Sequence, residues 1–143
     1  MNEEQRKSVR DILERHPEIL VAYLFGSRAR GTAGPMSDYD FALQIVDGVD
    51  GFEFASRIGA ELSEVFGTDE IDVVILNTVK DPVLKREAVL LGECLYVRDM
   101  LSRYGLERTI LQEYEDTRHF RNVQAEILDR QIRSGAIGKP MIR

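Results

Sequence analysis

The chain has 143 residues, of which 43% are hydrophobic and 31% are charged, a composition typical of one globular domain with its own core. Its formal net charge of −6 argues against a broad nucleic-acid surface, and no apolar run approaches the roughly 20 residues that a membrane span needs. A polar N-terminus, a single cysteine (Cys94) and two distant histidines indicate no signal peptide, no internal disulfide and no zinc site, so we expect a cytoplasmic protein.

The first part of the chain predicts a helix followed by a buried strand. Apolar residues recur at helical spacing within residues 3–15: Val9, Ile12 and Leu13. Residues 19–25 form a short apolar run rich in β-formers, which is typical of a buried strand. This strand ends at a glycine, after which residues 27–31 are expected to begin a short helix and residues 32–37 to form a loop.

The next segment alternates as a strand with two different faces. From residue 38 onward one face collects apolar side chains: Tyr39, Phe41, Leu43 and Ile45. The other face collects the intervening residues: Asp38, Asp40, Ala42 and Gln44. We therefore expect the first face to pack in the core and the second to carry chemistry where the strand begins.

The second half of the chain alternates helices and strands. In chain order it predicts a helix over 52–66, a strand over 70–76, a helix over 82–91, a strand over 93–97, and one bent helix or two from 99 to about 133. The expected fold class is therefore α/β, a small mixed β-sheet with helices packed against it. Residues 1–98 would form the core, and residues 99–143 a helical C-terminal extension of the same domain.

Charge is distributed unevenly between these two parts. Residues 100–143 contain eight Lys and Arg against six Asp and Glu, a net charge of +2, so residues 1–99 carry −8. Together with the apolar content of the last helices, this asymmetry suggests an assembly surface, either with another copy or with another protein.

Asp38 and Asp40 are the first candidate site residues. Residues two apart on a strand project to the same face, so these two carboxylates would lie side by side. Like charges at that separation repel each other unless a cation neutralises them, and a divalent metal is the usual solution. Asp72 lies within an apolar strand. It is either an acid that faces water on an edge strand or forms a structural ion pair, or it is a third carboxylate of the same site. If the two strands are neighbours, the three carboxylates converge and suit Mg²⁺.

The turn at Gly26 and Ser27 is the second candidate feature. Glycine permits a ligand to approach the backbone closely, and the Ser27 hydroxyl and nearby N–H groups can bind phosphate oxygens. Arg28 and Arg30 could add charge-assisted contacts to a triphosphate, with a solvated surface role as the alternative for each. The turn and the carboxylates together predict metal-dependent nucleotide chemistry.

The spacing of these residues resembles a known signature. A glycine–serine pair, ten residues and then Asp38-Tyr39-Asp40 resembles the GSx10DxD motif of the minimal nucleotidyltransferases, within the DNA polymerase β superfamily. Asp72 stands where that family has its third carboxylate, and residues 82–96 look like the corresponding segment of MntA-type antitoxins. The resemblance spans nearly the whole chain and implies a polymerase β-like core.

The resemblance also implies a function and a role for each site residue. Such proteins transfer AMP from ATP to a protein hydroxyl, and in MntA-type pairs the acceptor is a tyrosine of a HEPN-type ribonuclease toxin, which the modification silences. By position, Asp38 and Asp40 would hold Mg²⁺ on the triphosphate, and Ser27 would anchor the β- and γ-phosphates. Asp72 would hold the catalytic metal and help to deprotonate the attacking hydroxyl.

Two other functions stay open on the sequence. The chain could be a stoichiometric antitoxin that neutralises a HEPN-type toxin by binding alone, or a nucleotidyltransferase acting on a small molecule such as an aminoglycoside. Three clustered carboxylates argue against pure binding, and the lack of a visible second domain argues against a small-molecule pocket. We expect no direct nucleic-acid partner and no membrane association.

Overall fold

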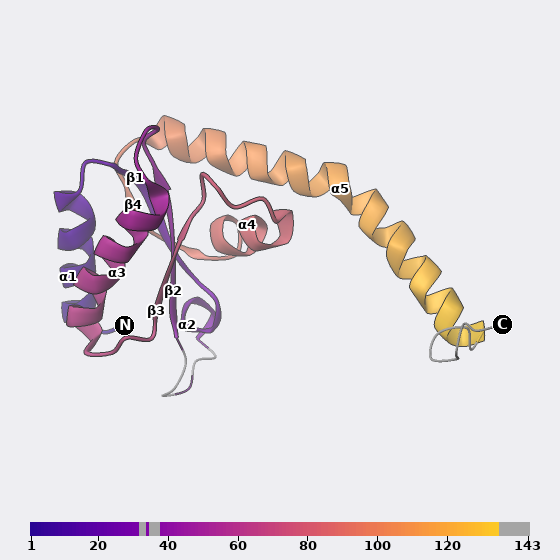
Figure 1. Ribbon diagram of the computed structural model, residues 1–143, viewed down its shortest axis with the longest axis horizontal. Coiled ribbons are helices and arrows are strands. Elements are labelled where there is room, and N and C mark those ends of the chain that lie inside the picture. The colour runs from indigo at the N-terminus through magenta and orange to yellow at the C-terminus, as the bar shows by residue number, and fades with distance from the viewer. Residues whose placement is uncertain (32–33, 35–37, 135–143) are drawn as a thin grey trace.

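The computed structural model describes residues 1–31, 34 and 38–134, apart from the side chains of Arg30 and His119. Its elements along the chain are α1 (Glu3–Arg15), β1 (Ile19–Phe25), α2 (Ser27–Arg30), β2 (Tyr39–Ile45), α3 (Gly51–Phe66), β3 (Ile71–Ile75), α4 (Pro82–Val89), β4 (Glu93–Val97) and α5 (Met100–Ser134) (Figure 1). The loop expected over 32–37 lies outside the described residues except for Gly34, as does the chain from 135 onward.

The four strands form one mixed sheet in the order β3-β2-β1-β4. β1 is antiparallel to both β2 and β4, whereas β2 and β3 are parallel. Parallel neighbours need a long crossover connection, which here contains α3. The fold is therefore the mixed α/β arrangement that the sequence predicts.

Helices α1 and α3 cover one face of this sheet. Their buried side chains lie in one hydrophobic cluster with the strands: Val9, Ile12, Leu13, Phe54, Ile58 and Leu62. The apolar alternation of β2 faces the same cluster, because Phe41 and Leu43 are fully buried in it. The prediction of a packed face for this strand is confirmed.

Helix α4 and the first part of α5 cover the other face. Ala88 and Val89 of α4 and Ile110 of α5 form a second cluster with residues of β1 and with Ala42 of β2. The sheet is thus sandwiched between two helical layers (Figure 1). Near the start of β2, Asp40 lies on the face toward α4, and this face is less tightly covered there.

Side-chain caps explain where the helices begin. Asn2, Asp50 and Asp81 each accept a backbone N–H at the start of α1, α3 and α4, respectively. The cap at Asp50 starts α3 at Gly51, one residue before the predicted start, and α4 ends at Val89 instead of near residue 91. The boundaries therefore differ from the predictions by one or two residues, as is usual for helix ends.

Gly92 lets the chain pass closely against the sheet as it leaves α4. A Cβ at this position would lie 2.2 Å from the Ala88 carbonyl oxygen and 2.8 Å from that of Leu24. Both neighbours are backbone atoms, which cannot move aside as a flexible side chain can. The close approach of α4, β1 and β4 therefore depends on this glycine.

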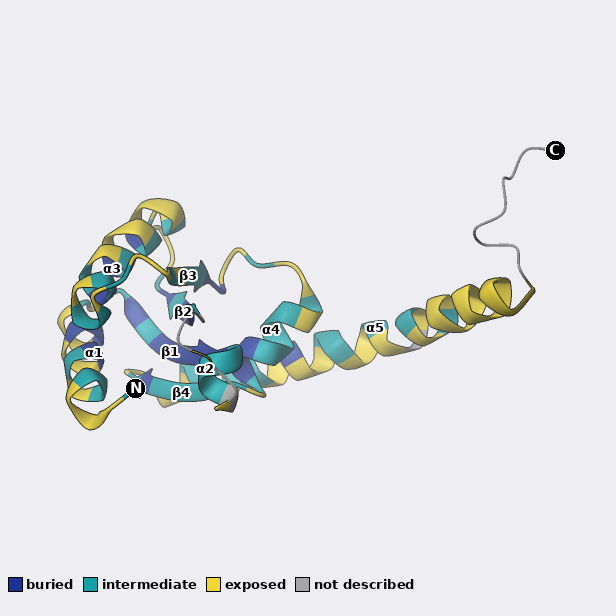
Figure 2. Ribbon diagram, turned by 90° about the horizontal axis from the view of Figure 1, so that it is seen from below, coloured by how far each residue is buried: buried dark blue, intermediate teal, exposed yellow. Residues whose placement is uncertain are grey.

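Helix α5 is a single helix of 35 residues, where the sequence left one bent helix or two open. Its first part belongs to the core, since Ile110 is only 2% exposed. Its second part extends away from the body, and its residues are mostly exposed (Figure 2). In the described part of the chain, no helix has the length and apolarity that crossing a membrane would take.

Candidate active site

The turn after β1 brings the backbone against a carboxylate. Gly26 has φ 76° and ψ −157°, a backbone conformation that residues with a Cβ rarely adopt. A Cβ at Gly26 would also lie 2.5 Å from Oδ2 of Asp40 on β2. Glycine is therefore needed here for two reasons, the backbone conformation and the approach of Asp40. Ser27 follows directly and begins α2.

The parallel pairing of β2 and β3 sets two further site residues opposite each other. Asp40 and Asp72 are register partners, so their side chains project from the same face of the sheet. This is the face toward α4, because the alternate residues Phe41 and Val73 pack with the α1–α3 cluster. The two strands are thus neighbours, which is the condition that the sequence set for convergence of the carboxylates.

A second acidic pair lies just before the two strands. Asp38 precedes β2 and Glu70 precedes β3, and the Tyr39 N–H donates a hydrogen bond of 3.0 Å to the Glu70 carbonyl oxygen. A side-chain hydrogen bond with Asp38, and then the charge of Asp38, raise the pKa of Glu70. Glu70 was not predicted as a site residue. Its spacing is nevertheless the same, because Glu70 precedes Asp72 by two residues as Asp38 precedes Asp40.

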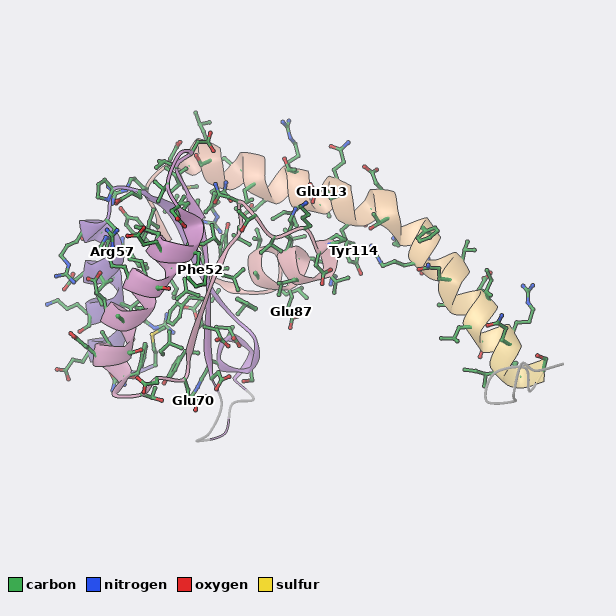
Figure 3. All side chains as sticks on the ribbon, viewed as in Figure 1. Phe52, Arg57, Glu70, Glu87, Glu113 and Tyr114 are labelled. Atoms are coloured by element: carbon green, nitrogen blue, oxygen red, sulfur yellow. The ribbon has the colours of Figure 1, made fainter. Side chains whose placement is uncertain are left out.

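Negative charge accumulates around Asp40. Burial raises the pKa of its carboxyl above the usual value, and the charges of Asp72 and Asp38 raise it further. Glu87 of α4 contributes in the same direction. Figure 3 shows Glu87 on the lower side of α4 and Glu70 at the lower end of the sheet. No pattern in the sequence pointed to Glu87, because only the packing of α4 on the sheet brings it near Asp40.

The donor atoms at this site suit Mg²⁺, which binds carboxylate oxygens and needs no histidine or cysteine. Asp40 and Asp72 are opposite each other on adjacent strands, and burial and then the charge of Asp72 raise the pKa of Asp40. Among the described residues, however, no group of three His, Cys, Asp or Glu side chains is already arranged as a metal site. Binding one ion through Asp38, Asp40 and Asp72 therefore requires their side chains to rotate, on a backbone that already places them on adjacent strands.

Of the two arginines expected to bind phosphate, the structure describes the side chain of only one. The Arg28 guanidinium lies 4.2 Å from the ring centre of Tyr39, which in turn stacks on Phe66 at 4.0 Å. This contact places Arg28 against the aromatic residues on the α3 side of the sheet, and its role at a triphosphate stays a prediction. Arg30 ends α2, and its side chain lies outside the described residues.

One wide groove lies away from these carboxylates. It has a volume of about 810 Å³ and runs between α1 and α3, with Asp11, Glu14 and Glu61 in its lining. A smaller cleft of about 460 Å³ runs between α3 and the edge strand β3 and includes Asp72. We assign the candidate site to the carboxylates. Neighbouring like charges that raise a pKa, beside a glycine that lets the backbone come close, are features of catalytic centres. The size of a groove alone is not such a feature.

Comparison with known proteins agrees with the fold described above. Residues 7–101, which run from within α1 to the first two residues of α5, match the family described as polymerase beta, nucleotidyltransferase. Among curated proteins no relative matches the chain.

Several solved structures share the fold over nearly the whole chain. A crystal structure of a toxin–antitoxin with AMP-PNP has a TM-score of 0.69 at 22% identity, covering 92% of this chain and 99% of the other. A tri-AMPylated Shewanella oneidensis HEPN toxin in complex with an MNT antitoxin gives a TM-score of 0.65 at 20% identity with the same coverage. The toxin–antitoxin MntA-HepT gives 0.65 at 19% identity, again with the same coverage. At these identities the likeness establishes a common fold.

Proposed function

The chain belongs to the polymerase beta nucleotidyltransferase family, and from this premise we propose that it transfers AMP from Mg²⁺-bound ATP to a tyrosine hydroxyl of a HEPN-type toxin and thereby acts as its antitoxin. The observation that carries the proposal is the pairing of Asp40 with Asp72 next to the Gly26 turn. A carboxylate pair beside a close backbone approach offers a place for a metal and a phosphate in contact with each other.

The residues of the chain take distinct roles in this proposal. Asp38, Asp40 and Asp72 hold Mg²⁺, which when bound neutralises charge on the triphosphate and on the departing pyrophosphate. Gly26 lets the triphosphate approach the backbone of the turn, and the Ser27 hydroxyl donates a hydrogen bond to a phosphate oxygen. The acceptor oxygen forms a bond to the α-phosphorus while the bond to pyrophosphate breaks, and Asp72 accepts the acceptor's proton.

Position and electrostatics carry the chemistry. Preorganised charges at a site of this kind typically contribute two to three orders of magnitude in rate for each group that is removed. The negative charges of Glu70 and Glu87 add to the demand for a cation near Asp40, because they lie close to the same carboxylates. A cation bound there removes repulsion that the folded chain otherwise bears.

The acceptor is proposed from the related complexes. One relative is an antitoxin solved together with a tri-AMPylated HEPN toxin, and another was solved with the ATP analogue AMP-PNP. Both observations concern those proteins, and they support ATP as the donor and a protein as the acceptor for this chain. Tyrosine as the acceptor residue rests on the resemblance to MntA-type antitoxins.

A second candidate function is neutralisation of the toxin by binding alone. The observation that favours it is the exposed end of α5, whose apolar side chains include Phe120 and Ile132 at 64% and 57% exposure. A binding protein of this kind would leave the acceptor chemically unchanged. The two functions therefore differ in one measurable property, the mass of the partner.

Intact mass spectrometry of the protein encoded beside this chain's gene tests the proposal. The partner is incubated with the chain and Mg²⁺-ATP, and a mass increase by one or more AMP units is expected. The Asp40→Asn variant should give no increase, whereas Asp11→Asn, the same change on the exposed face of α1, should act like the wild type. A stable complex without any mass shift would contradict AMP transfer and favour binding alone.

A further inference from the structure

The end of α5 carries an apolar face that nothing in the described structure covers. Beyond Thr117, the hydrogen bonds, ion pairs and ring contacts of the described residues stay within α5. Apolar residues recur there at helical spacing along one side: Phe120, Val123, Ile127, Leu128 and Ile132. We call this set the α5 stripe.

A helix end of this kind calls for a partner. Helical segments of this length are marginal in water unless an amphipathic face is packed, since each residue gains little beyond its own hydrogen bond. Four of the five stripe residues are large side chains between 47% and 64% exposed. A surface that covers the stripe would therefore stabilise both the helix and the complex.

The charges around the stripe argue against pairing with the same helix of a second copy. Residues 118–134 contain four arginines and two acids. At 3.6 residues per turn, Arg118 and Arg130 border the stripe on its two sides, and Arg121 lies within it between Leu128 and Ile132. Glu126 and Asp129 fall on the opposite face together with Arg133. Two copies joined through the stripe would bring arginine borders together, which disfavours that pairing.

The acidic groove between α1 and α3 of a second copy is also a poor binding site for the stripe. Its charge is opposite to that of the stripe, with Asp11 and Glu64 in its lining. Figure 1 shows, however, that α1 and α3 lie at the end of the molecule opposite to the far end of α5. Docking of one copy onto the next would then be a head-to-tail contact, which produces rings or open filaments and is detected as self-association.

A lipid surface fits the helix no better. Helices that lie on membranes carry a polar face rich in Lys and Arg, whereas the face opposite the stripe mixes Arg133 with Glu126 and Asp129. The chain as a whole has a net charge of −6, which anionic lipids repel. The remaining occupant is a different protein, with an apolar groove and acidic groups on both sides of it.

The helix that carries the stripe is firmly connected to the candidate active site. Lys85 of α4 pairs with Glu113 of α5 at 3.0 Å, and the Arg86 guanidinium lies 4.7 Å from the ring centre of Tyr114. Figure 3 shows Glu113 and Tyr114 on the part of α5 that passes over α4. Glu87, the next residue of α4, acts electrostatically on Asp40. A partner held on the stripe is thus held in a defined position relative to the carboxylates.

We propose that the α5 stripe docks into an apolar groove bordered by carboxylates on the same protein that presents the acceptor hydroxyl. The inference rests on the proposed function, because it assigns the docked protein as the AMP acceptor. Docking on α5 and chemistry at Asp40 are then separate events on one partner. The stripe determines affinity for the acceptor protein and leaves the chemical step unchanged.

The test compares two substitutions that introduce the same charge. Ile127→Glu places a carboxylate in the stripe, and Asn122→Glu places one on the opposite face of the same helix segment. Affinity for the protein encoded beside this chain's gene is measured by isothermal titration calorimetry, and AMP transfer is measured over a range of acceptor concentrations. We expect Ile127→Glu to weaken binding about 100-fold and to raise KM similarly with kcat unchanged, and Asn122→Glu to stay within about twofold.

Three results would overturn the inference. Equal affinity and KM for the two variants would remove the stripe from the interface. Self-association of the wild-type chain in light scattering that Ile127→Glu abolishes would identify a second copy as the occupant. Binding to phosphatidylserine vesicles that Ile127→Glu abolishes would identify a membrane.

The experiment distinguishes failure of the proposed function from failure of the docking surface. If the wild type binds through the stripe but transfers no AMP, the docking surface stands and the transferase does not. If Ile127→Glu transfers AMP at low acceptor concentration as well as the wild type, the transferase stands and the docking surface does not. The Asp40→Asn variant should bind the partner with wild-type affinity while transferring nothing.

Discussion

Replacing Gly26 with alanine tests the geometry of the site through a single methyl group. The new Cβ would lie 2.5 Å from Oδ2 of Asp40, a separation that real contacts do not show, so the carboxylate or the turn must move. The combination of φ 76° and ψ −157° lies in a region that is essentially restricted to glycine, and it adds backbone strain of about 1–3 kcal/mol for a residue with a Cβ. We expect loss of stability and, more importantly, displacement of Asp40 from its position beside the turn.

Gly67→Ala separates these two effects. Gly67 ends α3 with a φ of 64°, and a Cβ there would meet nothing within 4 Å. Gly67→Ala bears only the strain of the left-handed helical region, with ψ at 29°, of about 1–2 kcal/mol, which lowers the Tm by roughly 3–8 °C for a chain of this size. Only Gly26→Ala disturbs a carboxylate, and a misplacement of about 1 Å at a reacting centre costs roughly 100-fold in rate.

The assay measures AMP transfer to the partner protein by mass spectrometry, together with thermal melts of both variants. Gly26→Ala should lose roughly 100-fold in transfer rate, and Gly67→Ala should keep wild-type transfer despite its lowered Tm. The reasoning is refuted if Gly26→Ala transfers AMP at the wild-type rate, or if the two variants lose activity equally.

Three further predictions concern single side chains. Because the pKa of folded Asp40 is raised, its ionisation opposes folding, and stability is lost as the pH rises from the ordinary carboxyl value through the folded one. Asp40→Asn should thus melt higher than the wild type at neutral pH without Mg²⁺, with no difference well below the ordinary carboxyl pKa; a lower Tm at neutral pH would count against it. Gly92→Ala should destabilise the fold by about 3 kcal/mol or more in urea unfolding, because its Cβ meets two backbone oxygens; a change below 1 kcal/mol would contradict the close approach. Burial raises the pKa of the Cys94 thiol, so iodoacetamide should modify it more slowly at neutral pH than in denaturant, and equal rates would refute this.

Local pattern was enough to predict most of the fold. A strand repeats every two residues and a helix every 3.6, so the faces of β2 and the helical stretches could be assigned without knowing what they pack against. The side-by-side placement of Asp38 and Asp40 was predicted in the same way and stays a prediction, because β2 begins at Tyr39. Side-chain caps and glycines then decided the ends, which differ from prediction by one or two residues at α3 and α4.

The composition of the site depended on partners far apart in the sequence. The register that sets Asp40 opposite Asp72 is a property of two strands separated by α3, and the sequence could state it only as a condition. Glu70 followed the same two-residue spacing and was overlooked. Glu87 gave no signal, because its distance from Asp40 depends on how α4 sits on the sheet.

The sequence by itself therefore determined the elements, the buried faces and the residue types that could bind a metal and a phosphate, because backbone dihedral preferences and side-chain periodicity are local properties. Only the tertiary structure decided which carboxylates meet, that Arg28 lies on Tyr39, and that the end of α5 stands away from the core. These are outcomes of competition among packing arrangements of the whole chain. A contact between distant segments forms when the combined burial of many other residues brings the segments together, and no local pattern contains that sum.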